Sequence, residues 1–479
     1  MNMNISGMVS LIAPIAAILA AVCWPTTMAA TTLYPSQIPS VSRWNSIAID
    51  ASGLDHTPVS KNEKRVYGEQ LGPTRASRAM AIVHISMFDA MNAIVGKFHG
   101  YAYKTPAESG TSIDAAIAQA AHDCLVALFP SQKPTFDERL KEDLNTITNR
   151  EQRAYGVALG KSAAAAILLK RTGDGSNHTE PRLGVDFNTS TQPCSWQQDP
   201  ISKLNIALGA RWKEVTPFAM ENAMQFRLGP PPKLTSNIYT DAYMEAYRLG
   251  GDGNHTPTYR SEEETFIGIF WAYDGMPSLC APPRLYNQIA KQIATNRTEN
   301  DVDLLRLLAL VNVAMADAGI AAWESKYYYQ LARPVTCIRE DDGNVHTPTD
   351  TKFMPMGAPA SNTDNRPNFT PPFPAYPSGH AVFGGALFQT LREFYGRDDL
   401  NFTFVSDVFN GVTRDNKGNI RPYKPRTFSS LTEAETENSR SRIYLGIHWA
   451  FDASKGIDQG REVATHVYSK LFLPLEEPL

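Results

Sequence analysis

The chain of 479 residues is long enough for two or three domains of ordinary size, or for one large domain. Hydrophobic residues make up 43% of it and charged residues 20%, which excludes a disordered chain. Its 45 Lys and Arg residues are balanced by 49 Asp and Glu residues, and this balance argues against a nucleic-acid binder but not against a small anion site.

The N-terminal segment has the pattern of an export signal. No charged side chain precedes Arg43, and the stretch from Gly7 to Trp24 is almost wholly apolar. Small residues up to Ala30 follow it, as is typical before a cleavage site. We therefore expect residues 1–30 to be a signal peptide and the mature protein to be secreted or periplasmic. An uncleaved anchor helix is the alternative. No other run approaches membrane-spanning length in this interpretation, so stable membrane insertion after cleavage is not expected.

Besides Cys23 in the predicted signal peptide, the chain has four cysteines, Cys124, Cys194, Cys280 and Cys337. Four thiols can form two disulfides in an oxidising compartment, in any of three connectivities. No two of them lie close in sequence, so a CxxC metal or redox motif is absent.

The remainder of the chain favours a mainly α fold built of helical bundles. Residues 31–72 are expected to form an irregular lead. Apolar residues then recur three and four positions apart, which predicts helices over residues 73–95, 112–129, 151–170, 240–248, 262–273, 284–295, 301–331, 380–395, 431–445 and 448–472. Irregular segments over 177–234 and 341–377 lie between them, and alternating strand-like patterns are scarce.

These patterns suggest an N-terminal helical region over residues 73–234 and a C-terminal helical domain over 235–479. A run of three prolines, residues 230–232, marks the expected boundary. A single intertwined α domain fits the sequence nearly as well.

The first candidate functional motif ends the predicted helix over 301–331. Lys326 and Arg333 are seven residues apart, which places both on one helix face, and Pro334 is expected to end that helix. Two cations on one face repel each other unless an anion lies between them. A solvated basic face is the alternative.

The second motif is Pro-Ser378-Gly379-His380, at the start of a predicted helix. The free N–H groups and the positive end of a helix favour an oxyanion, and His380 could exchange protons with it. Alternatively, Ser378 is an ordinary capping serine beside an incidental histidine.

The third motif combines Arg442, His448 and Asp452. His448 and Asp452 are four residues apart and are expected to share a helix face, so that Asp452 can accept a hydrogen bond from one imidazole nitrogen and leave the other free as a nucleophile or metal ligand. The spacing between Arg442 and His448 suits a bend or a helix start. A salt-bridged surface helix is the alternative.

In this order, the three motifs resemble the superfamily that joins type 2 phosphatidic-acid phosphatases with vanadium-dependent haloperoxidases. The resemblance implies an oxyanion site in the C-terminal bundle, with vanadate as cofactor and His448 as the vanadium ligand. It implies that the vanadate oxygens are held by Lys326, Arg333, Ser378, Gly379, His380 and Arg442.

Features around the motifs are similar to the haloperoxidase branch. Trp323 lies three residues before Lys326, Phe373 leads into the second motif, and 60 residues separate His380 from Ser441, which directly precedes Arg442 of the third motif. The resemblance then implies that His380 takes a proton from hydrogen peroxide, that Lys326 polarises the peroxide, and that a halide is oxidised to hypohalous acid or its equivalent, which halogenates a small organic acceptor.

By the same resemblance, Asp274 would pair with Arg442, and Trp323 and Phe373 would shape the halide pocket. The sequence does not decide whether the protein forms a homo-oligomer. The runner-up is a secreted acid phosphatase acting through a phosphohistidine at His448, and an oxyanion-binding protein with a silent site is a third alternative.

Overall fold

The computed structural model describes residues 37–295, 297 and 300–475, so the predicted signal peptide lies outside the described residues. The described residues belong to one compact unit. The structure therefore shows no division near residues 230–235 and fits the alternative of a single intertwined domain.

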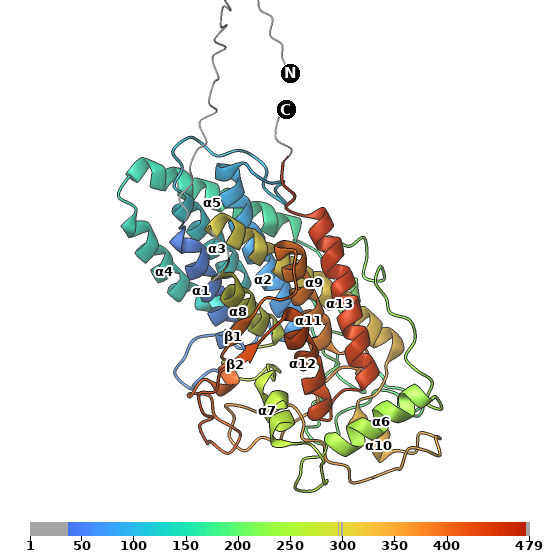
Figure 1. The fold of residues 1–479 in the computed structure, drawn as a ribbon. Coiled ribbons are helices and arrows are strands. Elements are labelled where there is room, and N and C mark those ends of the chain that lie inside the picture. The colour runs from blue at the N-terminus through green and yellow to red at the C-terminus, as the bar shows by residue number, and fades with distance from the viewer. Residues whose placement is uncertain (1–36, 296, 298–299, 476–479) are drawn as a thin grey trace, which may run out of the picture. The chain divides into compact units, whose positions relative to one another are not determined.

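The described part of the chain is mainly helical, as predicted (Figure 1). Its α-helices are α1 (Pro39–Asp55), α2 (Pro73–Val95), α3 (Ile113–Leu128), α4 (Lys133–Thr146), α5 (Arg150–Lys170), α6 (Asn237–Leu249), α7 (Glu262–Phe270), α8 (Pro282–Thr295), α9 (Asp301–Tyr329), α10 (Pro334–Arg339), α11 (Gly379–Tyr395), α12 (Leu431–Tyr444) and α13 (Ala450–Lys470). Two short strands, β1 (Phe402–Phe404) and β2 (Arg426–Phe428), pair antiparallel with Thr403 opposite Thr427.

Three helices were not predicted, and each lacks a clear apolar period. The described part of the predicted lead, residues 37–72, is not irregular throughout, because α1 occupies Pro39–Asp55. The buried face of α1 includes the polar residues Asn45 and Asp55, which hide the pattern. Of the residues of α4, only Phe136 is buried. Helix α10 has six residues, too few to show a period.

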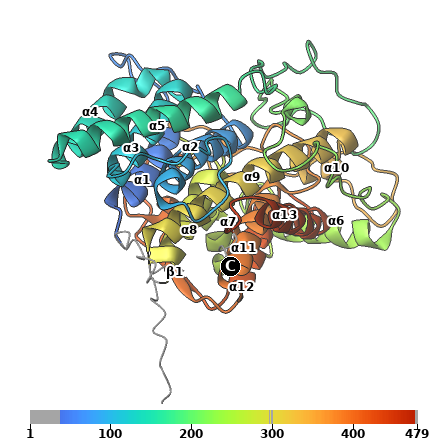
Figure 2. The ribbon, with the colours of Figure 1, turned by 90° about the horizontal axis from the view of Figure 1, so that it is seen from above.

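Helix α9 forms the centre of the core (Figure 1; Figure 2). It packs against α2, α8, α11 and α13, and nearly all of its residues from Val302 to Tyr327 are buried. Helices α2 and α9 are both long and apolar enough to span a membrane, with 83% and 94% of their apolar stretches buried inside the protein. The expectation that only the N-terminal run approaches this length is therefore wrong, since the hydrophobic core needs the same composition.

Helices α11 and α13 approach each other closely, and this contact positions the functional motifs. A side chain at Gly460 would lie 2.1 Å from the carbonyl oxygen of Val382, so only glycine fits there. The amide of Ser378, at the start of α11, donates to the carbonyl of Asp452 in α13 at 3.0 Å.

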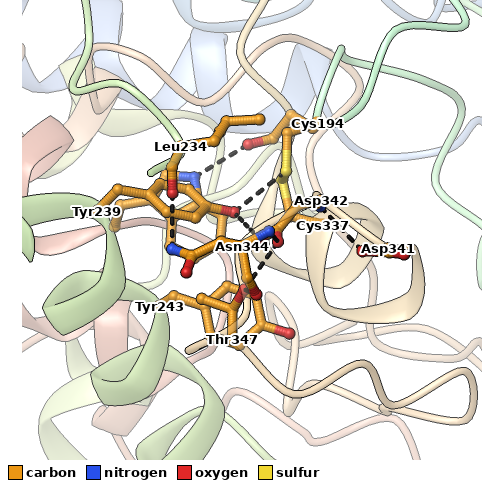
Figure 3. The surroundings of a disulfide bond; sticks show 12 residues. Cys194, Leu234, Tyr239, Tyr243, Cys337, Asp341, Asp342, Asn344 and Thr347 are labelled. Atoms are coloured by element: carbon orange, nitrogen blue, oxygen red, sulfur yellow. Dashed lines mark hydrogen bonds between the residues drawn. A yellow bond between two sulfur atoms is a disulfide. The ribbon is translucent and has the colours of Figure 1, made fainter. Parts of the chain in front are cut away.

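A disulfide between Cys194 and Cys337 ties the irregular segment 177–234 to α10 (Figure 3). The hydroxyl of Tyr239 lies 3.2 Å from the sulfur of Cys194 and donates to Asp342 at 2.8 Å. The other two cysteines of the described residues, at positions 124 and 280, are free and buried. One disulfide forms here, rather than the two that four thiols would allow.

Candidate functional site

The residues of the three motifs meet at one buried site, although they come from five different elements. All of them are buried, and His380, the most exposed of those that carry a side chain, is 6% exposed. They are Lys326 near the end of α9, Arg333 before α10, Ser378, Gly379 and His380 at the start of α11, Arg442 in α12, and His448 before α13.

Lys326 and Arg333 do not share a helix face, contrary to the sequence prediction. Gln330 adopts a left-handed conformation with φ of 48°, and this ends α9 at Tyr329. Arg333 is instead the N-cap residue of α10, and Pro334 begins that helix rather than ending the previous one, because proline is well suited to the first helical position.

The guanidinium group of Arg333 is fixed by main-chain oxygens. Its Nε donates to the carbonyl of Phe373 and its Nη1 to the carbonyl of Ile447, both at 2.9 Å. Nη1 also lies 2.7 Å from Nε2 of His448. Burial and the charge of Arg442, opposed by Asp452, lower the pKa of Arg333 to about 9.

The ammonium group of Lys326 lies among three carbonyl oxygens. It donates to Pro374, Ala375 and Pro377 at 2.9, 3.0 and 2.5 Å. Burial and the nearby charge of Arg333 hold its pKa well below the usual value. A further acceptor would therefore have to share or replace one of these carbonyls, and an anion beside Lys326 would raise its pKa.

The hydroxyl of Ser378 is a buried donor without a partner in the described residues. Ser378 is the N-cap residue of α11, yet its side chain makes no capping hydrogen bond. Its Oγ makes no hydrogen bond with any described residue and is shielded from solvent. The side-chain oxygen of a capping serine normally accepts a hydrogen bond from a backbone N–H of the first helical turn. Since Ser378 makes no such bond, its hydroxyl fits a role in ligand binding better than the capping alternative.

His380, in the first turn of α11, is held in one tautomer. Its Nε2 lies 3.1 Å from the carbonyl oxygen of Trp271, so Nε2 carries the hydrogen and Nδ1 keeps its lone pair. Tyr286 and Asn438 both donate to the carbonyl oxygen of His380 at 2.9 Å. Burial and the charge of Arg442 hold the pKa of His380 well below its usual value, so the ring is neutral.

Sequence reasoning missed Trp271, Tyr286 and Asn438. They lie on α7, α8 and α12 or next to them, outside the three motifs, and their side chains are buried. A buried tyrosine or tryptophan on an apolar helix looks like an ordinary core residue, so no signal in the sequence singles them out.

Arg442 and Asp274 form the predicted ion pair. Nη2 of Arg442 lies 2.6 Å from Oδ1 of Asp274, and both side chains are buried. Burial raises the pKa of Asp274, and the charge of Arg442 partly offsets this effect. The pair uses one nitrogen of Arg442 and leaves its Nε and Nη1 without partners in the described residues.

His448 contacts Asp452 as predicted, but the two residues do not share a helix. Helix α13 begins only at Ala450, and Nδ1 of His448 lies 3.0 Å from Oδ2 of Asp452 in its first turn. The break between Arg442 and His448 is confirmed. Burial and the charge of Arg333 hold the pKa of His448 well below its usual value, so that the ring donates from Nδ1 and presents the Nε2 lone pair.

Several donors around Nε2 of His448 have no acceptor among the described residues. They are Nη2 of Arg333, Oγ of Ser378, and Nε and Nη1 of Arg442. An unpaired buried donor destabilises the folded protein by about 1–3 kcal/mol. Four of them in one place are therefore strongly unfavourable unless a group with several hydrogen-bond acceptors binds there. We name this set, together with Lys326, the oxyanion cage. Its donors fit an oxyanion such as vanadate or phosphate.

A cavity of about 280 Å³ leads to the oxyanion cage. Trp323 and Phe373 form an aromatic pair in its lining, with ring centroids 4.9 Å apart. The irregular segment 177–234 contributes Leu204, Ile206 and Leu208, which no motif had indicated. Leu208 is held in place because its carbonyl accepts hydrogen bonds from Trp323 at 3.0 Å and from Tyr327 on α9 at 2.9 Å.

The chain was compared with known proteins. A family model described as the second helical-bundle domain of VCPO matches residues 306–476. Vanadium chloroperoxidase from Curvularia inaequalis is 31% identical over 494 residues, which cover 87% of this chain and 79% of that protein.

Among solved structures, the first bacterial vanadium-dependent iodoperoxidase superposes with a TM-score of 0.72 at 24% identity, covering 93% of this chain and all of that one. A holo-type bacterial vanadium-dependent chloroperoxidase superposes with a TM-score of 0.62 at 17% identity, covering 86% of this chain and 95% of that one. These two likenesses establish a common fold. The sequence identity to the fungal enzyme, over most of both chains, establishes that this chain belongs to the vanadium chloroperoxidase family.

Proposed function

We propose that the protein is a vanadate-dependent haloperoxidase, which uses hydrogen peroxide to oxidise a halide to hypohalous acid or its equivalent. The observation that carries this proposal is the oxyanion cage, in which unpaired buried donors lie beside His448, whose Nδ1 donates to Asp452 and whose Nε2 lone pair faces Nη1 of Arg333. The curated relative is named a vanadium chloroperoxidase, which agrees with it.

The cage residues fit vanadate by charge and by hydrogen-bonding capacity. Arg333, Arg442 and Ser378 would donate to its oxygens, and Nε2 of His448 would be the vanadium ligand. Bound vanadate supplies a Lewis-acidic centre that activates hydrogen peroxide toward a halide. Asp452 keeps the hydrogen of His448 on Nδ1, so that Nε2 stays available.

His380 is suited to accept a proton from hydrogen peroxide. Its Nδ1 keeps a lone pair because Nε2 donates to the carbonyl of Trp271, and its lowered pKa keeps the ring neutral. Lys326 would polarise the peroxide once it is protonated beside an anion. Trp323 and Phe373 form an aromatic wall of the cavity that leads to the cage, and such a wall favours a weakly hydrated halide.

We also propose that the protein is exported to an oxidising compartment. The apolar segment before Ala30 and the Cys194–Cys337 disulfide support this proposal. Mass spectrometry of the N-terminal peptide, from the culture medium or periplasm of the producing cell, tests it. Recovery of an intact N-terminus in the cytoplasmic fraction alone would contradict it.

The central test adds orthovanadate to purified apoprotein. Halide-dependent consumption of hydrogen peroxide should appear, and phosphate should compete with vanadate for the cage. A phosphoester assay is run beside it. Robust phosphoester hydrolysis that vanadate inhibits, without halide oxidation, would establish instead the acid phosphatase that acts through His448.

A further inference from the structure

The cavity that leads to the oxyanion cage is also lined by residues outside the cage. Its wall is largely apolar and includes Ile206 and Leu208 from the irregular segment 177–234 and Pro371 and Pro372 before the second motif. Halide and peroxide are small and polar, so an apolar wall of this extent contributes little to binding them. It suits an organic molecule.

Among the described residues, Arg366 is the one arginine or lysine that lines this cavity outside the cage. Arg366 is exposed, and its guanidinium makes no ion pair or hydrogen bond with any described residue. It lies close enough to Tyr67, which also lines the cavity, to act on the pKa of that phenol. A guanidinium with free donors beside an apolar wall is a typical site for a carboxylate.

His56 also lines this cavity, but its imidazole does not compete with Arg366 for a carboxylate. Nδ1 of His56 lies 2.8 Å from the carbonyl oxygen of Ser52, and Nε2 accepts a hydrogen bond from the amide of Gly72 at 3.0 Å. Both ring nitrogens are therefore engaged by the main chain. Arg366 is left as the group that would bind a charged ligand there.

We propose that this cavity binds the organic acceptor of the reaction, and that the acceptor combines an aromatic ring with a carboxylate. The ring would lie against the apolar wall and the carboxylate against Arg366. This inference rests on the proposed haloperoxidase function, and it adds that halogenation takes place on a bound acceptor rather than only on molecules that meet the oxidant in solution.

The reaction is electrophilic substitution on the ring. Hypohalous acid is the oxidant that the proposed activity supplies. A carbon–halogen bond forms while the halogen–oxygen bond of hypohalous acid breaks. The ring carbon then loses its proton, which combines with the released hydroxide to give water.

The test compares two phenols with the same ring, para-hydroxyphenylpropanoate and its uncharged amide. Their rings react almost equally with free hypohalous acid, because two methylene groups separate the ring from the charge. Binding of each to the protein is measured by calorimetry without peroxide, and kcat/KM for its halogenation is measured with the vanadate-loaded enzyme. Halide oxidation without any acceptor is followed separately.

The wild-type protein should bind and halogenate the acid about 1.5- to fivefold better than the amide, which is the range expected for one exposed ion pair. Arg366→Gln should lose this preference and leave halide oxidation unchanged. Arg366→Lys should keep part of it, since the charge remains. Arg414→Gln is the matched control: it removes an exposed arginine outside the cavity lining, whose guanidinium donates to Gly418 at 2.7 Å.

Equal binding of acid and amide by the wild-type protein, or a preference that survives in Arg366→Gln, would overturn the inference. Absence of halide oxidation would overturn the proposed function instead. The binding measurement does not depend on turnover, so it decides the role of Arg366 in either case.

Discussion

Replacing Ser378 by alanine should weaken anion binding without destabilising the folded protein. The hydroxyl is buried and has no partner in the described residues, so its removal deletes no hydrogen bond of the free protein. Leaving a buried hydroxyl unpaired costs about 1–3 kcal/mol, so the free energy of unfolding of the free variant should stay constant or rise by up to this amount.

Oxyanion binding should change in the opposite direction. A hydrogen bond from the hydroxyl of Ser378 to an anion is worth about 1.5–3 kcal/mol, and each 1.4 kcal/mol is a factor of ten in Kd. The Ser378→Ala variant should therefore bind orthovanadate roughly 10- to 150-fold more weakly. Titration calorimetry measures the affinity, and urea unfolding of the free protein measures stability.

Ser441→Ala is the matched control for this experiment. Ser441 is as deeply buried and precedes Arg442 in α12, but its hydroxyl already donates to the carbonyl of Asn438 at 2.6 Å. Its replacement should leave vanadate affinity within about twofold, since no free donor is lost. Wild-type vanadate affinity in Ser378→Ala, or a loss of stability in the free variant, would refute the reasoning.

The other predictions concern the charged groups of the cage. His448→Ala should lose tightly bound vanadium on gel filtration, whereas His380→Ala should retain it and lose turnover by about 10²–10⁴-fold; equal vanadium retention would contradict these roles. Because burial holds the pKa of His380 well below 6.5, kcat/KM should persist below pH 6.5 and decline only where the ring becomes protonated; a decline centred at 6.5 would contradict this. Since the pKa of Lys326 is also lowered and an anion raises it, phosphate binding should take up protons and weaken as pH rises, which calorimetry in buffers of different ionisation enthalpy detects; no proton uptake would refute it. Asp274→Ala should destabilise the free protein by about 3–5 kcal/mol in urea unfolding, because Arg442 loses its buried partner, and an unchanged midpoint would refute the pairing.

The sequence predicted helices well where the buried residues are themselves apolar. Helix α2 begins and ends where the periodicity places it, and α9 ends two residues early. Helices α1 and α4 were missed for opposite reasons: α1 buries polar residues on its inner face, while α4 buries almost nothing. A pattern of apolar residues detects a helix only where the helix buries apolar side chains.

The structure brings the predicted site residues together in one buried place, but their local geometry differs from the prediction. The spacing of Lys326 and Arg333 was interpreted on one continuous helix, whereas Gln330 breaks it with a left-handed conformation that its residue type does not signal. The contact of His448 with Asp452 survives a similar break, since a residue just before a helix can still reach its first turn. The cavity wall at Leu208 depends on long-range contacts with α9, which no local pattern encodes.

The unpaired donors of the oxyanion cage have a practical consequence for handling the protein. Any oxyanion that fills the cage binds the folded chain and not the unfolded one, so it shifts the unfolding equilibrium by about 2.7 kcal/mol at a hundredfold excess over its Kd. Phosphate in a growth medium or column buffer would raise the melting temperature while it blocks the place that vanadate needs. A buffer screen ranked by thermal stability would thus select the preparation that turns over most slowly.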